Sequence, residues 1–247
     1  SIKINSPDFI KWREYANSFA NKSPKISVKF IHNKLQGRLK PGNLDLAQKY
    51  LENSEYVIFL DIDSTLPQNL QIIEKSILEF SQDASLGWVQ FYTKSTNYNF
   101  NNRTRVISIF QNLLRANTHF RAQGGFTLFY GHNSIWRKSC LIKLGSWFEV
   151  HRGQVMITED ILKTVHAYNN GYYGKSLEFN TGEWVPHSLD ALETMWIRWT
   201  YGTCQVTHKY LFQILKTKNI SFFEKYDLIY LVTSYWSNAF LYPLLIT

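Results

Sequence analysis

YVIFLDIDSTL, residues 56–66, is a nearly unbroken apolar run followed by Asp61 and Asp63. Runs of this kind are typical of a central parallel strand, because other elements cover both of its faces. Ligands of such sheets bind beyond the carboxyl ends of the strands, which is where both aspartates stand. On an extended chain their carboxylates point to the same side and can hold Mg²⁺ or Mn²⁺, which in turn binds a diphosphate. The alternative is a strand-end pair that only caps the following turn.

Strand-like and helix-like stretches alternate on both sides of this run. We expect strands at 1–5, 26–33, 86–93 and 126–136, and helices at 7–20, 43–52, 69–81 and 103–122. This order predicts an α/β fold with a mostly parallel sheet flanked by helices. From Thr158 onward the pattern is mainly helical, and the chain contains neither an internal repeat nor a low-complexity linker.

Composition sets the class of protein. The 247 residues are 45% hydrophobic and 16% aromatic, which fits one large α/β domain with a sizeable core. The net charge of +8 is scattered along the chain, so no basic arm indicates a nucleic-acid partner. It suits anionic partners such as nucleotide diphosphates or an anionic lipid surface. Cys140 and Cys204 give neither a disulfide framework nor a zinc-ligand spacing, which predicts reduced, cytosol-facing thiols.

The C-terminal stretch predicts contact with a membrane. Residues 228–247 carry no charge and reach the length of about 20 residues that spans a bilayer. The preceding residues, 208–226, are amphipathic and rich in lysine, as on the cytoplasmic side of a membrane. We therefore expect a catalytic domain at 1–205, and an interfacial helix with the start of a transmembrane helix at 206–247. The alternative is a buried C-terminal helix.

The aspartate pair has a second interpretation. An apolar strand that ends D-x-D-S-T-L resembles the first motif of haloacid-dehalogenase-type phosphatases, whose nucleophile would be Asp61. That family also needs a later strand ending in paired acids, and two β-α units would not normally precede its first motif. The remaining aspartates after residue 63 each stand alone, at Asp83, Asp160, Asp190 and Asp227. The phosphatase is therefore the weaker interpretation.

Four further segments favour a different family. They are LKPGNLDLAQKY (39–50), FYGHNSIWRKS (129–139), ITED (157–160) and MWIRWTYGTCQ (195–205). In this order around D-x-D, they resemble the motifs of the cellulose-synthase-like branch of family 2 glycosyltransferases. The resemblance covers about residues 26–205 and implies a membrane-attached enzyme with a GT-A fold, which is a Rossmann-like α/β arrangement.

The resemblance implies a site for a nucleotide-sugar donor. In that family the residue that matches Lys40 approaches the nucleotide and the one that matches Asp61 approaches the donor. Asp63 would ligate Mg²⁺ or Mn²⁺ between the phosphates, and Arg198 would bind diphosphate oxygens in a bidentate way. A solvent-exposed lysine is the alternative for Lys40.

The resemblance also implies an acceptor side. Asp160, the last residue of T-E-D, would be the general base that takes the proton from the acceptor hydroxyl. Glu159, Gly131 and Asn133 would contact the acceptor, and Trp199 would offer a flat face for a sugar ring. The alternatives are structural: a helix N-terminus at 158–160, a strand-end turn at 131–133 and an aromatic stripe along a helix.

Two departures from the family's pattern lead to further expectations. Met195 stands where the family has glutamine, and a first strand followed by D-D-S or D-D-T is not recognisable. We therefore expect an N-terminally incomplete fragment, and a non-catalytic GT-A relative is the alternative function. The principal expectation is an inverting, metal-dependent transfer of a hexose from a UDP-sugar, or a GDP-sugar, to a saccharide or glycolipid hydroxyl. The residues indicate neither the sugar and linkage nor the oligomeric state.

Overall fold

The computed structural model describes residues 7–22, 29, 31, 39–51, 53–67 and 71–246. In chain order the helices and strands are α1 Pro7–Lys22, α2 Leu39–Gln48, β1 Tyr56–Phe59, α3 Gln71–Gln82, β2 Leu86–Ser95, α4 Asn102–Arg121, β3 Ser134–Arg137, α5 Lys138–Leu144, β4 Val150–His151, β5 Gln154–Val155, α6 Glu159–Asn169, β6 Tyr173–Glu183, α7 Leu189–Lys216 and α8 Phe222–Ile246. The strands predicted at 1–5 and 26–33 lie outside the described residues, apart from positions 29 and 31. The other predicted elements are present, although β1 and β3 are shorter than expected.

The α/β class is confirmed, but the prediction of a mostly parallel sheet is wrong for the strands described. Their order is β1-β3-β2-β6, and β3 is antiparallel to both β1 and β2. Only β2 and β6 are parallel among them. The chain enters β3 from a turn at 131–133, where Gly131 and Asn133 have φ values of 84° and 48°. Such a turn is not visible in the hydrophobic pattern, from which the strand direction was inferred.

Strand β6 was not predicted from the sequence. Its eleven residues, YGKSLEFNTGE, contain two glycines and several polar residues, which weaken the pattern of a buried strand. Pairing with β2 makes it an edge strand of the described sheet, with Leu86 opposite Tyr173 and Ser95 opposite Glu183. The strand carries the chain to the loop after β1, where Gly182 forms an isolated bridge with Thr65.

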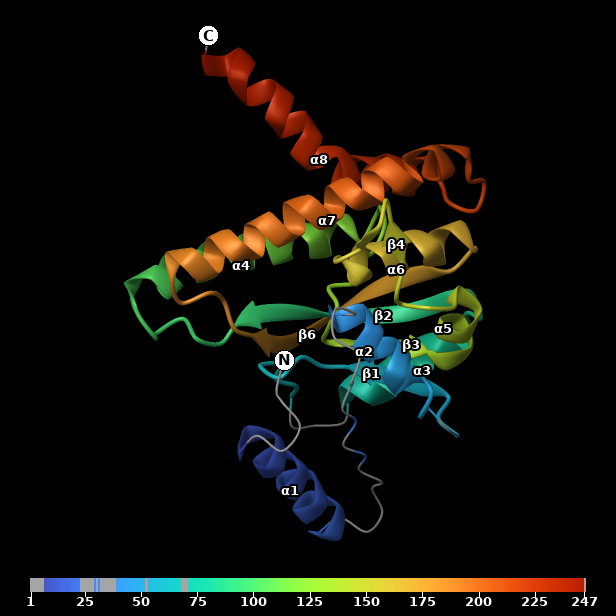
Figure 1. Cartoon of the computed structure of the whole chain (residues 1–247). Helices are drawn as coiled ribbons and strands as arrows, with labels where there is room; N and C mark the ends of the chain where they lie inside the picture. Colours follow the sequence, from blue (N-terminus) through green and yellow to red (C-terminus); the bar gives the residue numbers. More distant parts are fainter. Residues whose placement is uncertain are drawn as a thin grey trace.

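Two hydrophobic cores lie on the two faces of the sheet. Trp88 and Trp136 stack at a centroid distance of 4.8 Å and belong to the core that includes α6, α7 and α8. The adjacent residues on the same strands, Val89 and Ile135, belong to the core that includes α3. Because successive side chains of a strand point to opposite faces, this alternation sets which helices cover which side. Figure 1 shows α4 and α7 along one side of the sheet.

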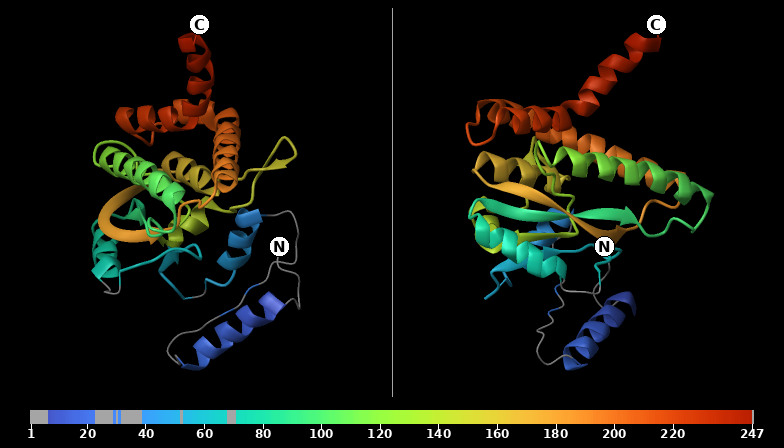
Figure 2. Two further views of the ribbon diagram at one scale, coloured as in Figure 1. Left: turned by 90° about the vertical axis from the view of Figure 1, so that its left-hand side faces the viewer. Right: turned by 180° about the vertical axis from the view of Figure 1, so that it is seen from behind.

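The C-terminal helices were predicted in part. Residues 222–246 form α8, which packs against α7 at its start and then extends away from the sheet (Figure 2). Arg121 and Asp227 form an ion pair of 2.6 Å that joins the end of α4 to α8. In the part of the chain that the structure describes, none of the helices combines the length and apolarity needed to cross a membrane. The start of a transmembrane helix expected within 206–247 is therefore not confirmed.

Candidate active site

Lys40 is at the centre of the predicted site residues. Its Nζ lies 2.9 Å from Asp61 Oδ1 and 3.3 Å from Glu159 Oε1. The same Nζ donates to the carbonyl oxygen of Gly131 at 3.3 Å. These residues belong to α2, the loop after β1, the start of α6 and the turn before β3. Four segments that are far apart in the sequence therefore meet at one amine.

Asp160 lies against the same group. A Cβ atom added to Gly131 would be 3.6 Å from Asp160 Cβ and 3.4 Å from Lys40 Nζ. Glycine at position 131 therefore lets the backbone of the turn approach both charged residues. The φ of 84° at this position also favours glycine. Asp160 is half-buried, and its Oδ1 accepts the N–H of Ile161 at 2.8 Å.

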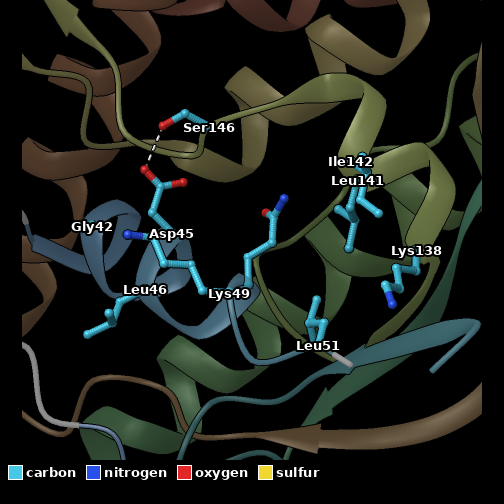
Figure 3. Close-up of a pocket in the computed structure, with 10 residues that line it drawn as sticks. Gly42, Asp45, Leu46, Lys49, Leu51, Lys138, Leu141, Ile142 and Ser146 are labelled. Atoms are coloured by element: carbon cyan, nitrogen blue, oxygen red, sulfur yellow. Dashed lines mark hydrogen bonds between the residues drawn. The ribbon is translucent and has the colours of Figure 1, made fainter. Parts of the chain in front are cut away.

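Helix α2, which carries Lys40, is also held by hydrogen bonds to the loop after α5. Asp45 accepts hydrogen bonds from Ser146 Oγ at 2.5 Å and from Trp147 N–H at 2.6 Å. Figure 3 shows Asp45 pointing toward Ser146 at the edge of a cavity of about 520 Å³ between α2 and α5. The buried Lys163 of α6 donates to the carbonyls of Gly145 and Ser146 at 2.8 Å each. The loop after α5 thus ties α2 to α6.

The carboxyl groups of Glu159 and Asp160 bind a proton more readily than exposed carboxyl groups do. Burial raises the pKa of Glu159 to about 7, and the charge of Asp160 adds to this while Lys40 opposes it. Burial also raises the pKa of Asp160. The hydrogen bond from Ile161 N–H and the charges of Lys40 and Arg198 lower this pKa, but burial outweighs them. Burial alone would lower the pKa of Lys40, but Glu159 and Asp61 outweigh it and raise that pKa. A carboxyl group with a raised pKa beside a persistent cation is typical of a site that exchanges protons.

Helix α7 packs directly on the T-E-D segment. Gly202 permits the approach, since a Cβ there would lie 2.3 Å from Thr158 Cγ2. Gln205 accepts from Ile157 N–H at 3.2 Å and donates to Val155 O at 3.1 Å. Arg198 is four residues before Gly202 and so lies on the same face of the helix. It is exposed, and its charge is near enough to lower the pKa of Asp160.

Trp199 is not linked to the cluster by any described contact. It is half-buried on α7 and makes neither a hydrogen bond nor an aromatic contact with a described residue. Its neighbour Trp196 lies 5.9 Å from the Phe110 ring, on the side of α7 next to α4. The role of Trp199 as an acceptor platform stays a prediction.

Asn133 lies beneath the site, where it has no exposed surface. Its side chain is fully buried, and Nδ2 donates to Gly182 O at 2.9 Å. Its φ of 48° belongs to the left-handed region, which asparagine adopts more readily than most residues. The geometry indicates that Asn133 holds the turn 131–133 against the end of β6. Direct contact with an acceptor was the expectation from the sequence.

Asp63, the metal ligand predicted from the sequence, lies in the loop after β1. Its Oδ2 accepts the N–H of Trp184 at 3.0 Å, and Oδ1 has no hydrogen bond to a described residue. Among the described residues, no three or more His, Cys, Asp or Glu gather as a metal-binding group. A magnesium ion that binds substrate phosphates usually needs only one or two protein carboxylates. Asp63 fits that requirement, whereas Asp61 is ion-paired with Lys40.

A buried carboxylate near the site was missed from the sequence. Glu183 ends β6 and is 5% exposed. Both of its carboxylate oxygens lie 2.9 Å from Arg115, and Oε2 lies 3.1 Å from His132 Nε2. No motif marks it, because one acidic residue at the end of an unpredicted strand is an ordinary feature. Its partners come from α4 and from the turn 131–133.

Comparisons with known proteins extend these observations. No protein-family model matches the chain. It is 24% identical over 217 residues to probable glucomannan 4-beta-mannosyltransferase 6 of Oryza sativa subsp. japonica, covering 83% of this chain and 35% of the relative. With probable glucomannan 4-beta-mannosyltransferase 2 of the same plant it shares 26% identity over 222 residues, covering 84% and 36%. The chain therefore spans about a third of the length of these relatives.

A solved structure has the same fold. Mannosyltransferase PcManGT from Pyrobaculum calidifontis, determined in complex with GDP-Man and Mn²⁺, superimposes with a TM-score of 0.60. The sequence identity is 15%, and the match covers 95% of this chain and 63% of that one. At this identity the match establishes the fold, which is the GT-A arrangement.

Proposed function

We propose that this chain, a distant homologue of plant glucomannan mannosyltransferases with a GT-A fold, transfers a hexose from a nucleotide-sugar to a hydroxyl group with inversion. The observation that carries the proposal is the convergence of Lys40 on Asp61, Glu159 and Gly131, beside Asp160. The predicted donor and acceptor sides thereby share one cluster of charged groups. The phosphatase interpretation gains no comparable support.

The donor side uses positive charge. A divalent ion such as Mg²⁺ or Mn²⁺, when bound at Asp63 with the diphosphate, would offset the charge that builds on the leaving group. Lys40 and Arg198 supply further cationic charge from α2 and α7. Glu159 was expected on the acceptor side, but its ion pair with Lys40 supports a donor-side role in which it orients that amine.

The acceptor side uses Asp160 as general base. Its carboxylate takes the proton of the acceptor hydroxyl while the hydroxyl oxygen attacks the anomeric carbon and the bond to the diphosphate breaks. Gly131 leaves room beside Asp160, and α7 holds the T-E-D segment through Gly202 and Gln205. A raised pKa keeps Asp160 a stronger base than an exposed aspartate.

Among donors we favour GDP-mannose over the UDP-sugar inferred from the sequence. The relatives are named as mannosyltransferases, and the neighbour of the same fold was determined with GDP-Man and Mn²⁺. The acceptor class stays a saccharide or glycolipid hydroxyl at the cytoplasmic surface of a membrane, with membrane lipid as a further partner.

The experiment compares radiolabelled GDP-mannose with UDP-hexoses, with Mn²⁺ or with EDTA, in the presence of manno-oligosaccharides and lipid extracts. Asp63→Asn is compared with Asp190→Asn, which makes the same chemical change at an exposed position on α7. We expect Mn²⁺-dependent transfer that Asp63→Asn removes and Asp190→Asn retains. Donor binding by a folded protein without transfer to any acceptor would support the non-catalytic alternative, and no binding of either donor class would contradict the proposal.

A further inference from the structure

The end of β6 contacts the loop that carries both aspartates. Trp184 N–H donates to Asp63 Oδ2 at 3.0 Å. The backbones of Gly182 and Thr65 exchange two hydrogen bonds, of 3.0 and 2.9 Å. A Cβ on Gly182 would lie 2.0 Å from Thr65 Oγ1, so the approach depends on glycine. The segment 182–184 therefore fixes the loop on the donor side.

The same segment also holds the turn 131–133, which faces the acceptor side. Gly182 O accepts from Asn133 Nδ2 at 2.9 Å, and Glu183 Oε2 lies 3.1 Å from His132 Nε2. Three consecutive residues of β6 and its exit thus bind both halves of the candidate site. A shift of this segment would change the distance between the two halves.

A buried ion pair anchors the segment to α4. Arg115 binds both oxygens of Glu183 at 2.9 Å, and Gln111 Nε2 adds a bond of 3.3 Å. The guanidinium of Arg115 also lies 4.0 Å from the Tyr130 ring centroid, just before the turn. Burial alone would raise the pKa of Glu183, but Arg115 and His132 outweigh it, so the pKa falls well below its ordinary value and the group stays ionised.

Gln90 of β2 supports the same turn. Its Oε1 accepts the N–H of Tyr130 at 3.0 Å, and its Nε2 donates to His132 O at 3.1 Å and Asn133 O at 2.9 Å. The backbone of the turn is therefore fixed by Gln90. The side chain of His132 adds a second attachment, to the carboxylate of Glu183.

We propose that Glu183, held by Arg115 and bound to His132, is a positioning residue for the glycosyl transfer. The proposal rests on the proposed function. Glu183 does not contact the Lys40 cluster; its effect passes through Gly182 and Trp184 to the aspartate loop and through His132 to the turn. A buried ion pair is often no more stabilising than apolar packing of the same volume. We assign Glu183 a role in aligning the two halves of the site because the ion pair lies between them.

The test uses paired histidine variants, because removing either member of the Arg115–Glu183 pair leaves a buried charge unpaired and can unfold the protein. His132→Leu removes the donor to Glu183, whereas His132→Gln keeps an amide donor at a similar reach. His119→Leu is the control: His119 is 5% exposed against 7% for His132, and it bonds Ser176 Oγ at 2.7 Å on β6. The kcat, the donor KM and the unfolding temperature are measured for all three variants and the wild-type chain.

We expect His132→Leu to lower kcat by about 10²-fold, the size of effect that a misplacement of about 1 Å produces, with little change in donor KM. His132→Gln should restore most of the rate, and His119→Leu should keep the wild-type kcat. A wild-type kcat in His132→Leu overturns the proposal. The proposal is also overturned if His132→Leu and His119→Leu both lose rate, and the loss in each is explained by its lower unfolding temperature.

A second readout separates this proposal from the proposed function. Electron paramagnetic resonance of Mn²⁺ with GDP reports the geometry of the donor side without any transfer. If the wild-type chain transfers no sugar, the proposed function fails, and the Mn²⁺–GDP spectra decide the positioning role alone. Spectra that differ from those of the wild-type chain in His132→Leu but not in His119→Leu support the proposal. Wild-type spectra in both variants overturn it.

Discussion

Substituting alanine for Gly202 tests whether the packing of α7 on the T-E-D segment controls activity. The added Cβ would lie 2.3 Å from Thr158 Cγ2, 2.7 Å from its Oγ1 and 2.9 Å from its Cβ. All three atoms are close to the backbone of a β-branched residue, so they cannot rotate far away. The helix must therefore move.

The size of the effect follows from these distances. Ordinary carbon–carbon contact needs about 3.5 Å, so α7 must move by about 1 Å from Thr158. Overpacking of this kind costs about 1–3 kcal/mol, and alanine recovers about 1 kcal/mol of helix propensity, so the free energy of unfolding falls by about 0–2 kcal/mol. A misplacement of about 1 Å beside Asp160 is expected to lower kcat by about 10²-fold. Activity should thus fall much more than stability.

The assay measures kcat and urea unfolding for Gly202→Ala, with two further variants for comparison. Thr158→Ala with Gly202→Ala removes the two nearest atoms; Thr158 makes no side-chain capping bond, and its buried Oγ1 has no partner among the described residues. This double variant should recover part of the rate, because Thr158 Cβ remains 2.9 Å from the added atom. Gly124→Ala, where nothing lies within 4 Å of the added atom, should change neither quantity. An unchanged kcat in Gly202→Ala, or no recovery in the double variant, refutes the reasoning.

Three other perturbations give distinct outcomes. Lys40→Met should raise the donor KM by tenfold or more, an order of magnitude based on losing a charge-assisted contact; a donor KM equal to that of the wild-type chain would place the amine outside the donor site. The kcat/KM should fall as the pH falls through about 7, because the Glu159–Asp160 pair must lose its proton, and a rate independent of pH between 5 and about 8 would argue against it. Since Glu159 binds its proton more tightly when folded, the free energy of unfolding should decrease as the pH rises from about 4.5 to about 7, and Glu159→Gln should reduce this slope in urea titrations to the part that Asp160 contributes.

The sequence predicted the centre of the candidate site because its residues occur in short motifs. Lys40, Asp61, Gly131, Glu159 and Asp160 were each identified from a motif, and the structure brings all five together. They meet at one edge of the sheet, where β1 ends and the antiparallel β3 begins, beside the starts of α2 and α6. The motifs identified these residues, but the position of Gly131 also depends on the direction of β3.

The direction of β3 and the surroundings of the site could not be predicted in this way. The direction of β3 depends on positive φ values at Gly131 and Asn133, which hydrophobic periodicity does not report. The burial of Asn133 and the pairing of Glu183 with Arg115 depend on contacts between residues that are 49 and 68 positions apart. Such non-local contacts leave no spacing pattern in a single sequence.

The most direct test of the central claim is the rate of transfer by Asp160→Asn, measured beside its affinity for Mn²⁺ and GDP. Asparagine preserves the acceptor oxygen that binds Ile161 N–H and removes the basicity together with the negative charge. We predict a kcat lowered by about 10²–10⁴-fold, as expected for the loss of a general base, with unchanged Mn²⁺–GDP affinity. Transfer at the wild-type rate by Asp160→Asn would contradict the account.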